Sequence, residues 1–270
     1  MTVTARDPDL TPFEEEEARP PSRLRRLVAD PGKVWGFVGV PIIVLASWAA
    51  LVLYMRGQEF DRIEQQYMTG ARIGRAFWEH IQLSLVATLL VVIVAVPLGV
   101  VLTRPFAKPT TPFFIGLANI GQAIPSVGLI FFLALLVATG PRTAILGVVL
   151  YCILPVLRNT MVGIYQVDRA LIEAGRGMGM TKGSVLLRIE MPLAVPIMLA
   201  GVRTALILTV GTMALATFIN AGGLGDIINA GIVHNRRSVL LTGALLTAGL
   251  ALLIDWAGGV AQELLRPKGL

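Results

Sequence analysis

Long apolar runs alternate with short polar segments along this chain. Each run is close to the roughly 20 residues that an α-helix needs to cross the hydrocarbon core of a bilayer. The pattern therefore predicts an all-α, polytopic membrane protein with about six transmembrane helices. The six predicted spans cover residues 34–55, 81–103, 112–138, 143–164, 192–217 and 239–262.

Composition supports the same fold class. Hydrophobic residues make up 55% of the 270 residues and charged residues only 15%, whereas a soluble domain carries about 25% charged residues. Residues 1–33 are polar and rich in proline and charge, which predicts a disordered cytoplasmic tail. The first span, 34–55, follows this tail, and residues 263–270 form a second cytoplasmic end.

The net charge of +6 has an explanation in membrane topology rather than in nucleic-acid binding. If the N-terminus is cytoplasmic, the inside segments hold fifteen Lys and Arg residues and the outside segments seven, with Arg203 inside a span. Positive residues gather on cytoplasmic loops. Both termini are therefore expected on the cytoplasmic side of the cell membrane, with lipid around the spans.

Polar residues inside the apolar runs are candidates for a translocation path. Arg203 lies eleven residues after Pro192, about 16 Å along a helix, so we expect it to pair with Asp255 or to line the path. A structural ion pair between two helices would serve equally well. A second group, which lines the conduit or satisfies backbone freed by a proline, comprises Asn119, Gln122, Pro125 and Ser126.

Other candidate sites are sparse. The turn AGGLGD ends the fifth span, and its glycines Gly222, Gly223 and Gly225 permit tight turns at an outer gate or simply close packing. His80 and His234 have no metal-ligand spacing and are expected to be solvated or interfacial. Cys152 is expected to be a small packing residue.

A polar, glycine-rich segment, EAGRGMGMTKGSVLLRIEMP, separates the fourth and fifth spans. Asp168 is a plausible N-cap for a short helix over 168–176, and Thr181 for a second helix that stops at Pro192. The glycines between them predict a flexible elbow. A phosphate-binding loop is excluded because the order is TKGS and no strand precedes it.

The segment resembles the EAA loop of ABC importer permeases. Its pattern is Glu-Ala-Ala, three residues, Gly, nine residues, then Ile-x-Leu-Pro, and every interval fits this chain although Gly175 replaces the second alanine and Met191 the leucine. We call residues 168–192 the EAA segment. The resemblance implies contact with an ATPase through Glu173, Ala174, Gly175, Gly179, Ile189 and Pro192.

The resemblance extends over about residues 75–262, through stretches such as QAIPSVGLIFFL at 122–133. It is strongest to permeases for osmoprotectants such as glycine betaine, choline and carnitine. It implies an ABC type I importer permease domain, a pair of ATPase subunits that bind ATP and magnesium, a second permease that is identical or a sister chain, and an extracytoplasmic substrate-binding protein. The chain itself would be no enzyme and would need no cofactor.

Three alternatives remain open. An ABC permease for an amino acid such as methionine or proline is the nearest, because methionine permeases share the glycine-rich turn after the fifth span. An ion-coupled secondary transporter or channel would need several intramembrane acids or inverted repeats. A membrane enzyme would need a metal cluster or an activated nucleophile, and the sparse histidines argue against it.

Overall fold

The computed structural model describes residues 31–265, with side chains described over 38–263. The predicted tail therefore lies outside the described residues, except for Pro31–Lys33. The chain divides into two units, Met1–Gly39 and Val40–Leu270. The second unit holds all the contacts discussed below.

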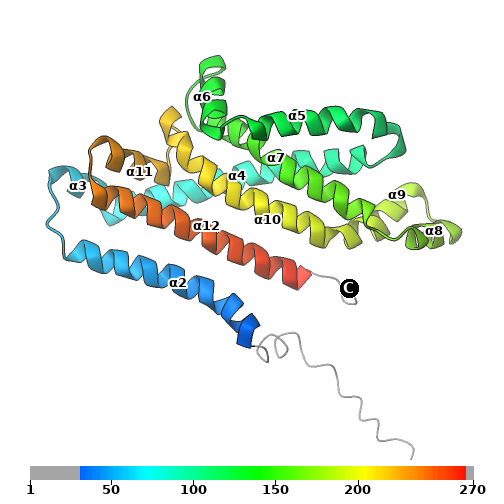
Figure 1. Ribbon diagram of the computed structural model, residues 1–270, viewed down its shortest axis with the longest axis horizontal. Helices are drawn as coiled ribbons and strands as arrows, with labels where there is room; N and C mark the ends of the chain where they lie inside the picture. The colour runs from blue at the N-terminus through cyan, green and yellow to red at the C-terminus, as the bar shows by residue number, and fades with distance from the viewer. Residues whose placement is uncertain (1–30, 266–270) are drawn as a thin grey trace, which may run out of the picture. The chain divides into compact units, whose positions relative to one another are not determined.

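Every regular element among the described residues is a helix, which confirms the all-α prediction (Figure 1). The long helices are α2 (Pro31–Arg56), α4 (Gly70–Leu102), α7 (Pro141–Tyr165), α10 (Met191–Leu215) and α12 (Arg237–Leu265). Each is long and apolar enough to cross a membrane, and the bent pair described below makes a sixth candidate span. The shorter elements are α3 (Arg62–Tyr67), η1 (Pro105–Thr110), α5 (Thr111–Ala123), α6 (Ser126–Leu136), α8 (Arg169–Gly177), α9 (Lys182–Val185), η2 (Leu186–Glu190), η3 (Ala216–Ile219) and α11 (Leu224–Val233).

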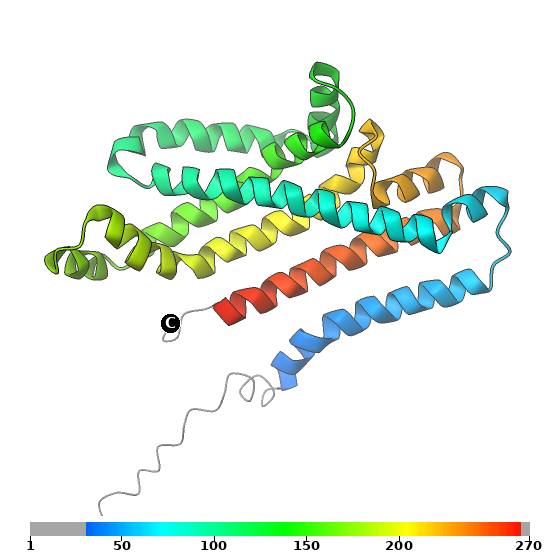
Figure 2. The same ribbon diagram turned by 180° about the vertical axis from the view of Figure 1, so that it is seen from behind.

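Small residues let α4, α7 and α10 pack closely, and Figure 2 shows these three helices side by side. A Cβ atom added at Gly99 on α4 would lie 2.8 Å from Thr160 on α7. One added at Gly163 on α7 would lie 3.0 Å from the Ala194 carbonyl oxygen on α10. Because lipid tails supply no hydrophobic drive between helices, such close backbone approach is a main source of their association.

The predicted third span, 112–138, is not one straight helix. It consists of α5 and α6, which meet at an angle of 100°. Ile124 and Pro125 both have extended backbone angles, with ψ of 134° and 127°. A proline disfavours helical conformation in the residue before it and offers no N–H of its own. The helix therefore ends at Ala123 and restarts at Ser126 in a new direction.

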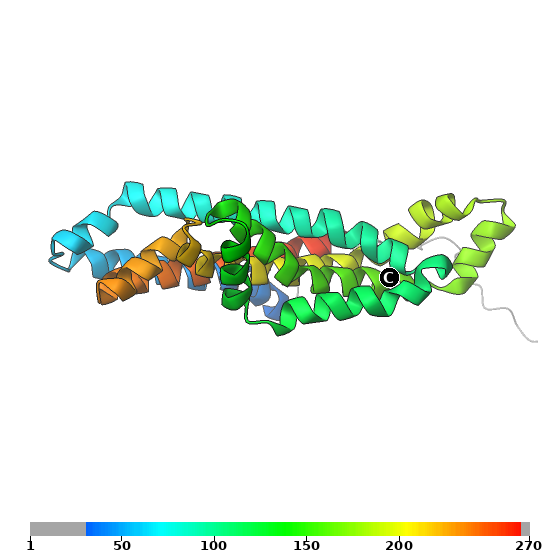
Figure 3. The ribbon, with the colours of Figure 1, turned by 90° about the horizontal axis from the view of Figure 1, so that it is seen from above.

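The two ends of the second unit carry different short helices, as Figure 3 shows. We call them the α3 end, which also carries α11, and the α8 end, which also carries α9. At the α3 end, Asp61 caps α3 and forms a 2.6 Å ion pair with Arg236. The backbone amide of Glu64 and then the Arg236 guanidinium lower the pKa of this carboxyl.

His80 corrects a prediction made from the sequence. It is fully buried in α4, where its Nε2 donates to the Val210 carbonyl oxygen of α10 over 3.1 Å. The expectation of a solvated or interfacial side chain was wrong because α4 begins at Gly70, eleven residues before the predicted span. Residue 80 therefore lies within a packed helix, while His234 is exposed as expected.

Candidate functional site

The EAA segment forms a compact helical turn at the α8 end. Its first helix, α8, begins as predicted, because the Asp168 side chain accepts a hydrogen bond of 2.9 Å from the Ala170 amide. This bond satisfies one of the orphan donors at the helix N-terminus. Glu173 and Ala174 lie on the exposed side of α8, while Gly175 is buried.

Gly179 lies just after α8, and a glycine at this position explains how the helix ends. Its φ is +83°, a left-handed conformation that glycine adopts without steric cost. The Gly179 amide donates to the Arg176 carbonyl over 2.9 Å, and the Met180 amide donates to the Gly175 carbonyl over 3.1 Å. These two bonds are a Schellman motif, which satisfies the last carbonyls of the helix and reverses the chain.

The second half of the segment differs from the prediction. Thr181 caps α9 as expected, and accepts a 3.2 Å bond from the Ser184 amide. The helix does not stop at Pro192, however, but continues through a π-helical turn, η2, into α10. A proline ring clashes with the carbonyl four residues before it, and the wider π-helical turn just before Pro192 accommodates that ring within a continuous helix.

Gly175 and Ile189 hold the two halves of the segment together. A Cβ atom at Gly175 would lie only 2.6 Å from Cδ1 of Ile189. The departure from alanine in the EAA pattern therefore gives Ile189 room to pack directly on α8. Three apolar side chains of the segment face outward, with exposed fractions of 47% for Leu171, 76% for Met178 and 70% for Leu187. We call these three exposed side chains the apolar surface of the EAA segment.

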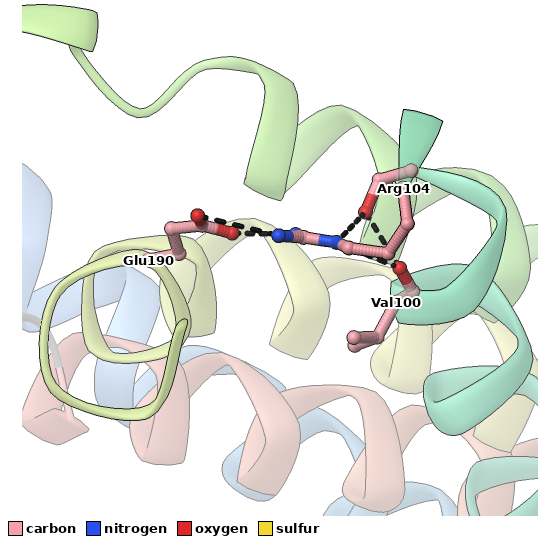
Figure 4. Close-up of polar contacts among 4 residues, drawn as sticks. Val100, Arg104 and Glu190 are labelled. Carbon is pink, nitrogen blue, oxygen red and sulfur yellow. Dashed lines mark hydrogen bonds and ion pairs between the residues drawn. The ribbon is translucent and has the colours of Figure 1, made fainter. Parts of the chain in front are cut away.

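Sequence reasoning missed the strongest polar contact of this region. Arg104, just after α4, forms an ion pair with Glu190 of the π-helical turn, with 2.5 Å between Nη2 and Oε2 (Figure 4). Arg104 Nη1 donates to Glu190 Oε1 over 3.4 Å. Glu190 is only 5% exposed. The signal in the sequence was an acidic residue just before a predicted span, with nothing to indicate its partner 86 residues away.

The structure joins Arg203 to Asp255, so the predicted pairing is confirmed. Arg203 Nε donates to Asp255 Oδ1 over 2.5 Å and Nη2 donates to Oδ2 over 2.8 Å. The pair ties α10 to α12. Gly258 and Gly259 lie against the Arg203 side chain, where an added Cβ would come within 3.2 Å and 3.1 Å of it. Whether Arg203 lines a path stays a prediction.

The second polar group lies at the bend between α5 and α6, on different elements from the Arg203 pair. Asn119 accepts a 2.8 Å hydrogen bond from Arg158 of α7 through its Oδ1. Gln122 and Ser126 flank the break at Pro125 and are partly exposed. The bend thus places polar side chains within an otherwise apolar candidate span.

The glycine-rich turn lies against α4 at the α3 end. Gly222 and Gly223 have φ of +88° and +81°, and the Gly223 amide donates to Glu79 over 3.1 Å. A Cβ atom at Gly225 would lie 2.2 Å from the Ala214 carbonyl oxygen. Glycine is thus required at positions 222 and 223 by the positive φ, and at position 225 by the close approach of the Ala214 backbone. Over the described residues, no group of three His, Cys, Asp or Glu side chains could hold a metal ion.

In the part of the chain that the structure describes, five long apolar helices and one bent pair, with a capped helical turn between two of the spans, are the architecture of an integral-membrane protein. Residues 95–267 match the family of binding-protein-dependent transport system inner membrane components, and the chain belongs to this family. This result confirms the family that the EAA segment indicated, and establishes a multi-pass protein of the membrane.

Named relatives agree with this assignment. A carnitine transport permease protein of Listeria monocytogenes is 41% identical over 76% of this chain and 92% of its own length. A choline transport system permease protein of Bacillus subtilis is 42% identical over 72% of this chain and 88% of its own. These relatives are transport permeases rather than enzymes.

The fold matches a solved permease. An inward-facing structure of the MetNI methionine ABC transporter contains a chain that is 26% identical, with a TM-score of 0.63. The match covers 70% of this chain and 94% of the other. The type I importer permease fold predicted from the sequence is thereby confirmed.

Proposed function

We propose that this chain is the permease subunit of an ABC importer that moves an osmoprotectant such as glycine betaine, choline or carnitine into the cell. The observation that carries the proposal is the EAA segment, a capped and glycine-locked helical turn that presents an apolar surface between two spans. The carnitine and choline permeases named above support the substrate class.

The energy for transport comes from a partner in this proposal. A pair of cytoplasmic ATPase subunits binds ATP and magnesium, and each ATPase subunit binds the EAA segment of one permease subunit. The ATPase is contacted by the exposed side chains of the EAA segment. These are Glu173 and Ala174 of α8 together with the apolar surface that includes Leu171 and Met178. Burial of these apolar side chains against a groove provides affinity, as in other helix-in-groove complexes.

The family implies the other components of the transporter. A second permease, identical or a sister chain, completes the pathway, and an extracytoplasmic binding protein delivers the solute. Both termini and the EAA segment lie in the cytoplasm, as the distribution of Lys and Arg favours. The polar bend at Asn119, Gln122 and Ser126 and the Arg203–Asp255 pair are the proposed path or gate residues.

An amino-acid permease is the second candidate. The observation that favours it is the structural match to a methionine transporter, which has a TM-score of 0.63. Sequence identity favours the osmoprotectant class, at 41% against 26%. Both candidates use the EAA segment in the same way, so they differ only in the solute.

Uptake of radiolabelled solutes separates the candidates. Cells that express the ATPase and the binding protein, with or without this chain, are given glycine betaine, choline, carnitine, proline and methionine. We expect chain-dependent uptake of at least one of the first three. Uptake of methionine or proline alone would transfer the chain to the amino-acid class. No uptake of any of them despite a stable ATPase complex would refute the substrate assignment.

A further inference from the structure

The ion pair between Arg104 and Glu190 joins the end of one span to the junction of the EAA segment with another. Arg104 is the first residue after Thr103, which closes α4, and Glu190 is the last residue of the π-helical turn η2, directly before α10. Within the described residues, the hydrogen bonds between the end of α4 and the EAA segment all belong to this pair.

The geometry of the pair fixes both the orientation of the Arg104 guanidinium relative to the Glu190 carboxylate and the distance between them. Both guanidinium Nη atoms point at the two Glu190 oxygens, so the contact is bidentate. Arg104 Nε donates to the Val100 carbonyl over 3.3 Å (Figure 4). It also donates to Thr103 Oγ1 over 3.2 Å. The guanidinium of Arg104 is thus hydrogen-bonded both to the last turn of α4 and to Glu190.

Adjacent residues of the π-helical turn face two different neighbours. Ile189 packs on Gly175 of α8, and Glu190 binds Arg104 beyond α4. π-helical turns are rare, and they are frequent at functional sites. Here the turn is the junction at which α8, α10 and the end of α4 are linked.

The burial of Glu190 argues against a purely stabilising role. The Glu190 side chain is only 6% exposed, while that of Arg104 is 25% exposed. Taking the Glu190 charge out of water costs desolvation energy, and a hydrophobic pair of similar volume is often no less stable than a buried ion pair. A bidentate pair has a property that an apolar contact lacks, because its two parallel hydrogen bonds fix the relative orientation of the groups that they join.

We propose that Arg104 and Glu190 are positioning residues that transmit movement of the EAA segment to α4, so that α4 and α10 respond together to the ATPase. This inference rests on the proposed function and deepens it. Movement of the EAA segment reaches α10 through the continuous helix and reaches α4 through the ion pair. Loss of the pair would leave ATP hydrolysis intact while fewer solute molecules cross for each ATP.

The test uses the complete transporter in proteoliposomes, with its ATPase, binding protein and radiolabelled glycine betaine. The quantity measured is the coupling ratio, the number of solute molecules imported per ATP hydrolysed. We expect Glu190→Gln and Arg104→Gln to lower this ratio by roughly tenfold, which corresponds to about 1.4 kcal/mol of lost coupling free energy, while stimulated ATP hydrolysis persists. The exchanged double variant Arg104→Glu/Glu190→Arg should recover a large part of the ratio.

A matched control is available at the other end of the unit. Asp61→Asn breaks the 2.6 Å ion pair with Arg236 and should leave the coupling ratio unchanged.

The inference is overturned if the single variants keep the wild-type ratio, or if uptake and hydrolysis fall in parallel with the amount of assembled complex. Wild-type complexes that hydrolyse ATP without importing any osmoprotectant would instead count against the proposed substrate. A chain that assembles with no ATPase would refute both.

Discussion

At the scale of single residues, the caps and turns of the EAA segment could be predicted from the sequence because their chemistry is local. Asp168 and Thr181 cap helices as expected, since a short acceptor side chain satisfies amides two or three residues away. His80 could not be predicted in the same way. Its side chain is buried against α10, where the hydrogen-bond acceptor is the carbonyl oxygen of Val210, 130 residues distant in the sequence.

Gly179 yields a prediction at this scale. Gly179→Val would place a β-branched side chain in a left-handed conformation, at a cost of about 1–2 kcal/mol and with loss of the Schellman turn. We expect the ATPase to copurify at a fraction of the wild-type amount while the permease still inserts into the membrane. Affinity purification of the tagged permease, followed by quantification of the bound ATPase, measures the effect.

Gly177 provides the control for that experiment. It lies two residues earlier, its φ is not positive, and an added Cβ would meet nothing within 4 Å. Gly177→Ala should therefore leave ATPase binding at the wild-type level, since alanine is the better helix former. Equal loss of ATPase in both variants would show that the backbone angle of Gly179 is not the cause.

At the scale of elements, the apolar runs predicted which segments are helical but not how they connect. The 20-residue pattern located five of the spans within the long helices, although α4 begins eleven residues before the predicted span. It could not reveal that Pro125 turns one run through 100° while Pro192 is taken up within a continuous helix. Both are prolines in apolar surroundings. The outcome depends on whether the preceding backbone is extended, as at Ile124, or wound into a π-helical turn, as at Leu186–Glu190.

The bend between α5 and α6 leads to a second prediction. Pro125→Ala restores an amide and removes the restriction on Ile124, so we expect the two helices to straighten toward one span. Spin labels at Thr111 and Leu136, the outer ends of the pair, should then move apart relative to the parent protein. The matched control is Pro141→Ala at the first residue of α7, where proline breaks no helix. An unchanged label distance in Pro125→Ala would mean that packing, rather than the proline, sets the bend.

At the scale of the whole molecule, the fold class, the family and the position of the EAA segment could all be predicted from the sequence. They follow from repeated apolar runs and from one spaced motif. The Arg104–Glu190 contact could not be predicted, because it joins two helices whose packing no local pattern encodes. Arg104 and Glu190 meet only because the folded chain brings α4 and α10 beside each other.

Membrane orientation provides the prediction at this scale. Cysteines introduced at Gln66 in α3 and at Met178 after α8 are both at exposed positions at opposite ends of the unit. A membrane-impermeant thiol reagent should label the first in intact cells and the second only after permeabilisation. The native Cys152 is buried and should stay unlabelled in both conditions. The reverse labelling pattern would invert the proposed topology.

The helical path from Lys182 to Ile219 has a mechanical consequence. It runs for 38 residues, or about 57 Å at 1.5 Å per residue, nearly twice the roughly 30 Å of the hydrocarbon core. The path includes the π-helical turn η2 and Pro196, and if it moves as one body a helix of that length acts as a lever. If one end pivots by about 10°, simple geometry moves the other end by about 10 Å. A small tilt at the base is then enough to open a gap wider than a small solute at the opposite tip.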